Sequence, residues 1–294
     1  MFKKVLLPLD GSTEAESPLP YIKDFSHRFN SKVHILGVGI GSKRRKVNRL
    51  LTDYVQDTAA NLNQDGVAAR PHMLYGHAAE QISLFIKENA IDLLVMATHG
   101  RTGVTRWWIG SVAESVITEA AIPVLLVRSK RLKETEAGKT KTFHHILVPL
   151  DGSDIGESAL QYAEILALKL NATISLLHVI HSFDGLGFDI PGYDLKVMTK
   201  KLNDSGEEYL RKIAERLKNK GIKFSSKISV GNPASTIIEF AQEKKIDLIA
   251  MSTHGRSGIA RWVLGSVADK VLRESSLPLW LVRSPKMTVE KNNT

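Results

Sequence analysis

LLVMATHGRTGVTRWWIGSVAESVITEAAIPVLLVR occupies residues 93–128 of the chain and returns as LIAMSTHGRSGIARWVLGSVADKVLRESSLPLWLVR at residues 248–283. Nineteen of the 36 aligned positions are identical, so we treat the two segments as copies of one unit. Each copy begins with an apolar run of strand length and passes through a glycine-rich turn into an amphipathic helix. A second apolar run follows a proline. The repeat therefore predicts a strand, loop, helix and strand unit that occurs twice.

The loop of each copy has the composition of an anion-binding site. Glycine tolerates positive φ angles and lets the backbone approach a ligand without an intervening Cβ. The serine after the last glycine lies where the first N–H groups of a helix lack intrahelical partners and the helix dipole attracts negative charge. The residues concerned are Gly100, Arg101, Gly103, Arg106, Gly110, Ser111 and Val112 in the first copy and Gly255, Arg256, Gly258, Arg261, Gly265, Ser266 and Val267 in the second.

A tight turn in which Ser111 and Ser266 cap their helices is the alternative interpretation. Both copies share Thr-His-Gly-Arg, the same spacing between glycines and the same Gly-Ser-Val-Ala entry into the helix, which favours an anion site. The loop is not a Walker A motif, because no Gly-Lys-Ser/Thr closes it. Its glycine spacing also differs from the dinucleotide-binding fingerprint.

The length and composition of the chain suit two globular domains. The chain has 294 residues, 43% hydrophobic and 24% charged, and domains of about 140 residues can each bury a core. No apolar run approaches the roughly 18 residues of a membrane span. The start of the sequence, MFKKVLLPLD, is too short and too soon acidic for a signal peptide, so we expect a cytoplasmic protein without membrane association.

The cysteine count and the net charge limit which kinds of site and which partners the protein can have. With no cysteine, the chain has no disulfide, thiolate metal site or thiol nucleophile. The net charge of +9 favours anionic partners in general. The basic residues are scattered and lack interleaved aromatics, which speaks against a nucleic-acid interface.

Aligning the two halves predicts the same order of elements in each. Helices separate all the strands, so the economical topology is an α/β fold with an open, parallel, five-stranded sheet and helices on both faces. We expect strands at residues 5–8, 33–38, 69–74, 146–149, 173–179 and 223–230, in addition to those of the repeated unit. We expect helices at residues 47–63 and 195–219, two others capped by Ser17 and by Ser153, and two more that begin near Ala78 and Ala234.

Domain boundaries follow from the same alignment. We expect a first domain at residues 1–129, a polar linker at 130–142, a second domain at 143–285 and a tail at 286–294. The second half carries 14 extra residues at about 181–194, rich in glycine and aromatics, at the carboxyl end of a strand. A lid, a partner contact and a tolerated surface insertion all remain open for this segment.

With these motifs assembled, the chain resembles the universal stress protein family, as a tandem of two such domains. The likeness rests on the Asp-Gly-Ser turns after the first strands, the glycine loops and the final Pro-Val-Leu-Leu-Val-Arg strand. The family has an adenine-nucleotide-binding branch marked by Gly, two residues, Gly, nine residues and Gly-Ser/Thr. Both copies match the later part of that pattern. The first glycine is replaced by Ala97 in one half and by Ser252 in the other.

The resemblance implies an adenine-nucleotide-binding stress-response protein that takes ATP or AMP, with Mg²⁺ bound through the nucleotide. It implies that Asp10 and Asp151 face the ribose or the metal. It implies that Pro8 and Pro149 wall the base and that Val38 and Val179 contact adenine through the main chain. Alternatively, the aspartates are turn residues ahead of glycine. His99 and His254 either donate to a phosphate or hydrogen-bond within the loop, and we expect Trp107, Trp108 and Trp262 to be packing residues.

Partners and competing functions complete the sequence-based expectations. In this family the final strands pair between domains, so residues 123–127 and 278–282 could pair within one chain, and a homodimer remains open. An ATPase or phosphotransferase is one alternative function, although no general base is held by a recognisable second group. A scaffold with empty sites is the other.

Overall fold

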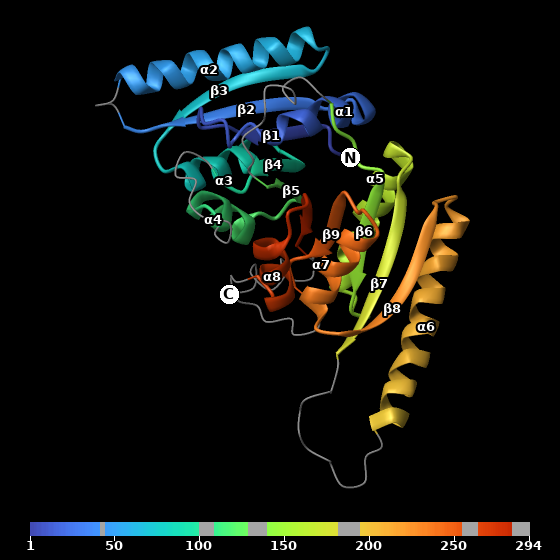
Figure 1. The fold of residues 1–294 in the computed structure, drawn as a ribbon. Coiled ribbons are helices and arrows are strands. Elements are labelled where there is room, and N and C mark those ends of the chain that lie inside the picture. Colours follow the sequence, from blue (N-terminus) through green and yellow to red (C-terminus); the bar gives the residue numbers. More distant parts are fainter. Residues whose placement is uncertain (42–44, 100–108, 129–139, 182–194, 255–263, 284–294) are drawn as a thin grey trace. The chain divides into compact units, whose positions relative to one another are not determined.

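The computed structural model describes residues 1–41, 45–99, 109–128, 140–181, 195–254 and 264–283, and the chain divides into two compact units. The first unit comprises the described part of residues 1–142 together with residues 276–283. The second comprises the described part of residues 143–275. Figure 1 labels the helices and strands of both units. Each unit is described by itself below.

The first unit is an α/β sheet with the predicted order of elements. Its strands lie in the order β3-β2-β1-β4-β5, all parallel, and β10 adds to β5 in the antiparallel direction. The strands are β1 (Lys4–Pro8), β2 (Lys32–Gly39), β3 (Ala68–Tyr75), β4 (Leu93–Ala97), β5 (Val124–Val127) and β10 (Leu279–Val282). The helices are α1 (Leu19–Phe29), α2 (Arg45–Gln64), α3 (Ala78–Glu88) and α4 (Ser111–Glu119).

The second unit repeats this connectivity with four parallel strands in the order β9-β6-β7-β8. The strands are β6 (His145–Leu150), β7 (Thr173–His181), β8 (Phe224–Gly231) and β9 (Leu248–Ser252). The helical elements are the 3₁₀ turn η1 (Gly156–Ala159), α5 (Leu160–Leu170), α6 (Leu195–Asn219), α7 (Pro233–Glu243) and α8 (Ser266–Glu274). The predicted α/β fold with a predominantly parallel sheet is therefore confirmed.

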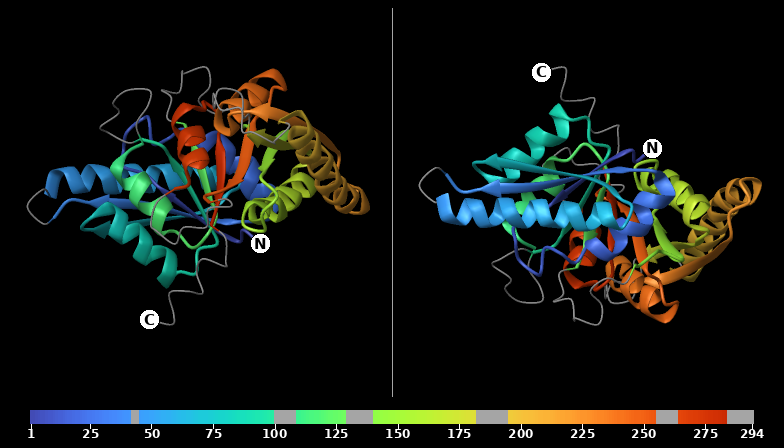
Figure 2. Two further views of the ribbon diagram at one scale, coloured as in Figure 1. Left: turned by 90° about the horizontal axis from the view of Figure 1, so that it is seen from below. Right: turned by 90° about the horizontal axis from the view of Figure 1, so that it is seen from above.

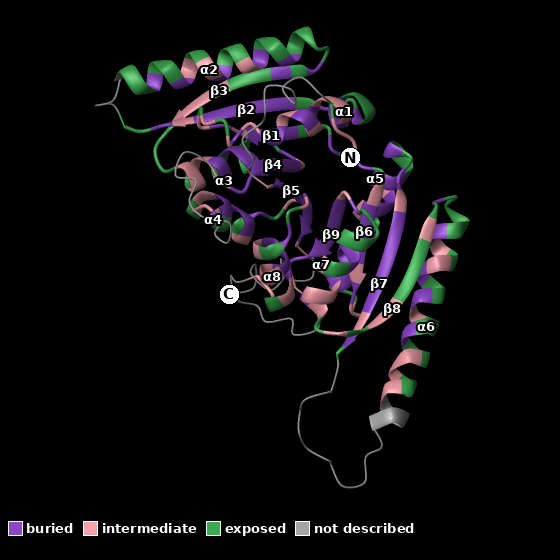
Figure 3. Ribbon diagram, in the orientation of Figure 1, coloured by how far each residue is buried: buried purple, intermediate pink, exposed green. Residues whose placement is uncertain are grey.

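Burial follows the position of each strand in its sheet. Every residue of β4 and of β9 is buried, which explains why the repeated unit begins with an uninterrupted apolar run. The outer strands β3 and β8 are half exposed and correspondingly more polar, as the colours in Figure 3 show. The core of each unit thus lies around its central strands.

Helices cover both faces of each sheet. In the first unit α2 packs on β2 and β3, whereas α3 and α4 pack on each other on the opposite face (Figure 2). The second unit repeats this arrangement, with α6 on β7 and β8, and with α7 against α8. Helices on both faces are the arrangement expected when α/β crossovers connect parallel strands. Among the described residues, no helix combines the length and the apolar character needed to cross a membrane.

The starts of two helices differ from the prediction. Ser153 does not cap α5: its hydroxyl oxygen accepts from Gly156 N–H at 3.0 Å, and a short 3₁₀ turn separates it from the helix. Ser17 likewise donates to the Glu14 carbonyl at 2.8 Å, and Pro18 precedes the first residue of α1. In both cases the serine stabilises the turn after an Asp-Gly-Ser sequence, which delays the helix.

Candidate functional site

The site lies where the strand order of the second unit reverses. From β6 the chain proceeds to β7 and β8 on one side and returns to β9 on the other, so β6 and β9 are neighbours that lead in opposite directions. Helices after such strands diverge and leave a crevice at the carboxyl ends, which is where open α/β sheets bind ligands. Pro149 and Asp151 lie at that end of β6, and Ser252 at that end of β9.

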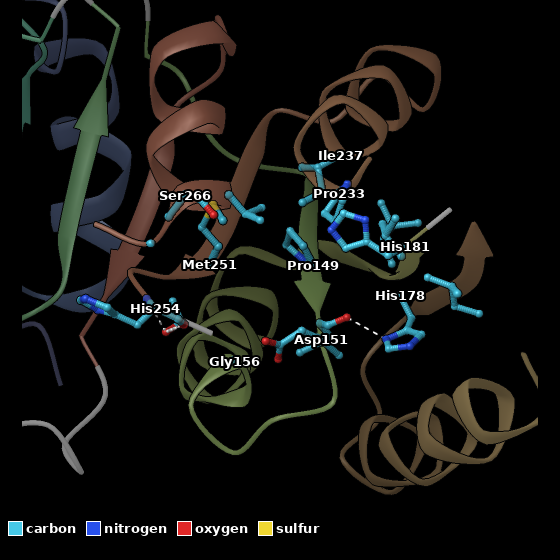
Figure 4. Close-up of a pocket in the computed structure, with 18 of the residues that line it drawn as sticks. Pro149, Asp151, Gly156, His178, His181, Pro233, Ile237, Met251, His254 and Ser266 are labelled. Atoms are coloured by element: carbon cyan, nitrogen blue, oxygen red, sulfur yellow. Dashed lines mark hydrogen bonds between the residues drawn. The ribbon is translucent and has the colours of Figure 1, made fainter. Parts of the chain in front are cut away.

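A cavity of about 440 Å³ occupies this position (Figure 4). Its volume lies within the usual range for small-molecule sites. Eight residues singled out from the sequence line it, namely Pro149, Asp151, Val179, Ser252, His254, Gly265, Ser266 and Val267. The tertiary structure therefore brings together, in one cavity, residues from β6, β7, β9 and α8.

The aspartate at the end of the first strand is held by its own turn. In the second unit Asp151 Oδ1 accepts from Ser153 N–H at 3.0 Å and from the Ser153 hydroxyl at 2.7 Å. The same bonds join Asp10 to Ser12 at 3.0 and 2.6 Å in the first unit. The turn interpretation of these aspartates is therefore correct as far as Oδ1 is concerned. Asp151 also lines the cavity, so the turn holds an acidic residue at the wall of the candidate site.

The last glycine of each loop lies close to a backbone carbonyl of the preceding turn. Gly110 and Gly265 both have φ of −60°, so the expected positive φ is wrong at these two positions. Instead, their N–H groups donate to the carbonyls of Thr98 and Thr253 at 2.9 and 2.8 Å. A Cβ at either glycine would lie 3.3 Å from the same carbonyl oxygen, closer than most such contacts. This hydrogen bond closes the loop and sets the direction of the helix that follows.

The serine after each of these glycines is the first residue of its helix, not its cap. Gly110 and Gly265 are the N-caps of α4 and α8, and neither cap provides a side-chain hydrogen bond. The capping alternative for Ser111 and Ser266 is therefore wrong. By helix geometry the N–H groups of the first three residues have no intrahelical acceptor, and in α8 all three of these residues line the cavity. The positive end of the helix dipole thus faces the cavity.

The residues that follow β9 are bonded to one another. The Ser252 hydroxyl donates to the His254 carbonyl at 2.6 Å, and Thr253 Oγ1 lies 3.0 Å from His254 Nδ1. In the first unit Thr98 Oγ1 and His99 Nδ1 make the corresponding contact at 3.1 Å, whereas Ala97 has no hydroxyl to offer. The hydroxymethyl of Ser252 is thus accommodated within the turn. The hydrogen-bonding interpretation of both histidines agrees with these contacts.

The proline and valine pairs occupy equivalent places in the two units. Pro8 ends β1 and Pro149 is the penultimate residue of β6, and both are half exposed at the carboxyl edge. Val38 in β2 and Val179 in β7 are half exposed on the neighbouring strands. In the first unit, Pro8, Asp10, Val38 and Ala97 therefore lie at the carboxyl ends of β1, β2 and β4.

Several lining residues were not identified from the sequence. They include Gly156, Leu177, His178, Ile180, His181, Leu202, Pro233, Ile237 and Met251. The signal that would have found some of them is strand alternation, since Leu177 and His181 share the face of Val179. His178 is buried, and its Nδ1 donates to the Leu150 carbonyl at 2.9 Å. No single-sequence pattern connects Pro233 or Ile237 to this site.

Part of the predicted site lies outside the described residues. This applies to Gly100, Arg101, Gly103, Arg106, Gly255, Arg256, Gly258 and Arg261, to Trp107, Trp108 and Trp262, and to nearly all of the 181–194 insertion. Within the described ranges, no group of three or more His, Asp or Glu side chains is placed to hold a metal ion. A metal near Asp10 or Asp151 would therefore depend on ligands supplied by a bound molecule.

The fold and the cavity define a doubly wound α/β protein with a cavity at the switch point of its second unit. Within that class, the model of the universal stress protein family matches residues 1–128 and again residues 142–283. The chain therefore belongs to the universal stress protein family.

Individual relatives agree with this assignment. The chain is 33% identical over 144 residues to universal stress protein MJ0531 of Methanocaldococcus jannaschii, covering 49% of this chain and 84% of that protein. It is 32% identical over 148 residues to YxiE of Bacillus subtilis, covering 48% and 99%. A universal stress protein structure from Archaeoglobus fulgidus superimposes with a TM-score of 0.73 at 22% identity, covering 96% and 99%, which shows a shared fold.

Proposed function

We propose that this chain is a stress-response protein that binds an adenine nucleotide, ATP or AMP, in the cavity of its second unit. The observation that carries the proposal is the cavity itself. It lies at the β6–β9 switch point and adjoins the first turn of α8. A phosphorylated ligand fits this arrangement, because the free N–H groups and dipole of the helix attract anions while the remaining walls are largely apolar.

The orientation of the nucleotide follows from the chemistry of the walls. Its phosphates would lie at Gly265, Ser266 and Val267, at the positive end of α8. The base would lie against Pro149 and Val179, and Asp151 would accept from the ribose hydroxyls. The choice of adenine rests on the family resemblance. We extend the same roles to Pro8, Asp10, Val38, Gly110, Ser111 and Val112 of the first unit as part of the proposal.

Magnesium enters this proposal only with the nucleotide. Among the described residues that line the cavity, Asp151 is the single acidic one, and its Oδ1 already accepts two hydrogen bonds from Ser153. A Mg²⁺ ion would therefore take most of its ligands from phosphate oxygens and water, and would contribute by neutralising phosphate charge.

We further propose that the two family domains, residues 1–129 and 143–285, associate within one chain through their last strands. The support is the antiparallel pairing of β10 with β5, in the register Leu279 with Leu126 and Leu281 with Val124. Pairing of this kind covers an apolar strand edge. A cytoplasmic location and a homodimer of the whole chain remain parts of the proposal to be tested separately.

Titration calorimetry with ATP, AMP and adenosine tests the proposed binding. We expect ATP and AMP to bind with a stoichiometry of at least one and more tightly than adenosine, because phosphate contributes at α8. Mass spectrometry of nucleotide released from freshly purified protein would identify the natural ligand. If none of the three ligands binds, the scaffold function is correct. If adenosine binds as tightly as ATP, the helix terminus does not contribute to affinity.

A further inference from the structure

The two ends of the cavity differ in chemistry. At one end lies Ser266, the first residue of α8, and at the other lie Pro149, Pro233 and Ile237 (Figure 4). A nucleotide is charged at one end and carries a flat, mainly apolar ring at the other. With its phosphates at α8, its base therefore enters the apolar end. This step rests on the proposed function.

Two imidazoles line the cavity, and they differ in whether they are free to contact a ligand. His178 is buried, donates from Nδ1 to the Leu150 carbonyl at 2.9 Å, and packs its ring against Tyr209 with centroids 5.9 Å apart. His181 is the last residue of β7 and is exposed. Within the described ranges, no residue hydrogen-bonds to the His181 imidazole. Figure 4 shows this imidazole lying toward Pro149 and Pro233, at the apolar end of the cavity.

We propose that His181 is a specificity-determining residue whose imidazole hydrogen-bonds to the edge of a bound heteroaromatic base. A base that enters an apolar pocket loses water from its ring nitrogens and exocyclic groups, and this loss costs free energy unless the protein supplies a partner. His181 can supply one because its imidazole both donates and accepts.

The first unit lacks this group. Aligning the halves with the offset of 141 residues places Ile40, an exposed aliphatic residue directly after β2, where the second unit has His181. Ile40 cannot hydrogen-bond to a base. The two halves therefore differ in base discrimination even if both accept phosphate, and the second half is the one that selects the base.

The test is calorimetry of the full chain and of His181→Phe with ATP, adenosine and tripolyphosphate. Loss of one hydrogen bond should weaken adenosine and ATP binding about five-fold. Tripolyphosphate affinity should not change, because that ligand has no base. Ile40→Phe introduces the same residue at the equivalent place in the first half and is the control. It should leave the binding of adenosine and ATP by the second unit unchanged. An unaltered thermal unfolding midpoint would confirm that the variants are folded.

Two results would overturn the inference while leaving the proposed function intact. One is a His181→Phe protein that binds adenosine as tightly as the parent. The other is an equal loss of affinity for tripolyphosphate, which would place His181 at the phosphates. If the parent protein binds neither ATP nor adenosine, the proposed function fails and the inference fails with it. His181→Asn, which retains a donor and an acceptor, should bind adenosine more tightly than His181→Phe.

Discussion

The Glu164 carboxylate on α5 accepts a hydrogen bond of 2.5 Å from the ammonium group of Lys220, which follows α6. Glu164 is 3% exposed and also lies 2.7 Å from Arg216 Nε, with the geometry of an ion pair and not of a hydrogen bond. An ion pair also joins the equivalent helices of the first unit, but with the charges exchanged. There the cation, Lys23, lies on α1, and the anion, Asp65, follows α2. Both halves thus have an ion pair at this place, and the acidic and basic residues have exchanged positions.

This exchange of charge leads to a prediction for unfolding free energy. Glu164→Lys should destabilise the second unit by roughly 3 kcal/mol or more, because a buried cation would face Arg216 and Lys220 without a counter-ion. Adding Lys220→Asp should recover part of that loss, since it recreates the pairing of the first unit. Urea denaturation of the three proteins measures the coupling. A double variant no more stable than Glu164→Lys would show that the link is not transferable.

A pH dependence is expected from the histidine pair of the first unit. His34 Nδ1 and His72 Nε2 lie 3.1 Å apart, and both rings contact Phe85. Burial, followed by the repulsion of His72 and nearby cations, lowers the pKa of His34 below 6.5, and burial likewise lowers the pKa of His72. The unfolded chain therefore takes up protons first as pH falls. This contribution to stability is present above about pH 6.5 and is lost as pH falls through the folded pKa values.

Thermal unfolding between pH 8 and pH 5 measures this effect. An effect on the order of 1 kcal/mol would shift the unfolding midpoint by about 2–4 °C. His34→Ser combined with His72→Gln should flatten this part of the profile. His77→Gln changes an exposed histidine and is the control. An unchanged profile in the double variant would mean that other groups control the pH dependence.

Gly156 is expected to matter for nucleotide affinity through Asp151. A Cβ at Gly156 would collide with Asp151 Oδ1. Gly156→Ala should therefore displace the carboxylate and weaken ATP binding by roughly five- to ten-fold. The first unit has Ala15 at the equivalent position, in a turn that lacks the 3₁₀ segment. Ala15→Gly is the matched control and should leave the affinity of the second unit unchanged. If Gly156→Ala binds ATP as tightly as the parent protein, Gly156 does not position Asp151 for binding.

Trp280 on β10 is expected to stabilise the first unit. Its fully buried ring meets the Phe2 ring edge-on with centroids 5.1 Å apart, and the Phe25 ring at 6.1 Å. Trp280→Ala should cost about 3–5 kcal/mol, as large-to-small changes of buried aromatics do. Trp280→Phe should cost much less, because among the described residues the indole N–H has no hydrogen-bond partner. Guanidinium denaturation measures the unfolding free energy of both variants. If Trp280→Phe loses as much as Trp280→Ala, the packing role of the ring is contradicted.

The sequence predicted the elements of the fold well because their signals are local. The helix at residues 195–219 begins and ends where expected, and the strand boundaries differ from the predicted ones by at most two residues. The pairing of Lys23 with Asp65 could not be predicted in this way. It joins residues 42 positions apart, and no local period connects them.

The candidate site was predicted in part, and the errors share a cause. The glycine before each helix was identified, but its role was not, because only tertiary structure places the Thr98 and Thr253 carbonyls against Gly110 and Gly265. His181 was overlooked as a binding residue because its position beside Pro233 depends on how β7 lies against α7. Strand alternation gives the face of a side chain but not the neighbour it meets.

By itself the sequence determined that the chain repeats one α/β unit and that polar and glycine-rich turns follow its central strands. Periodicity and internal repetition are properties of neighbouring residues, so a single chain displays them. Only the tertiary structure decided that β6, β7, β9 and α8 enclose a common cavity, and that Trp280 completes the aromatic cluster around Phe2. Those arrangements depend on packing between residues far apart in the chain, and packing is fixed by the shapes that meet when the sheet forms.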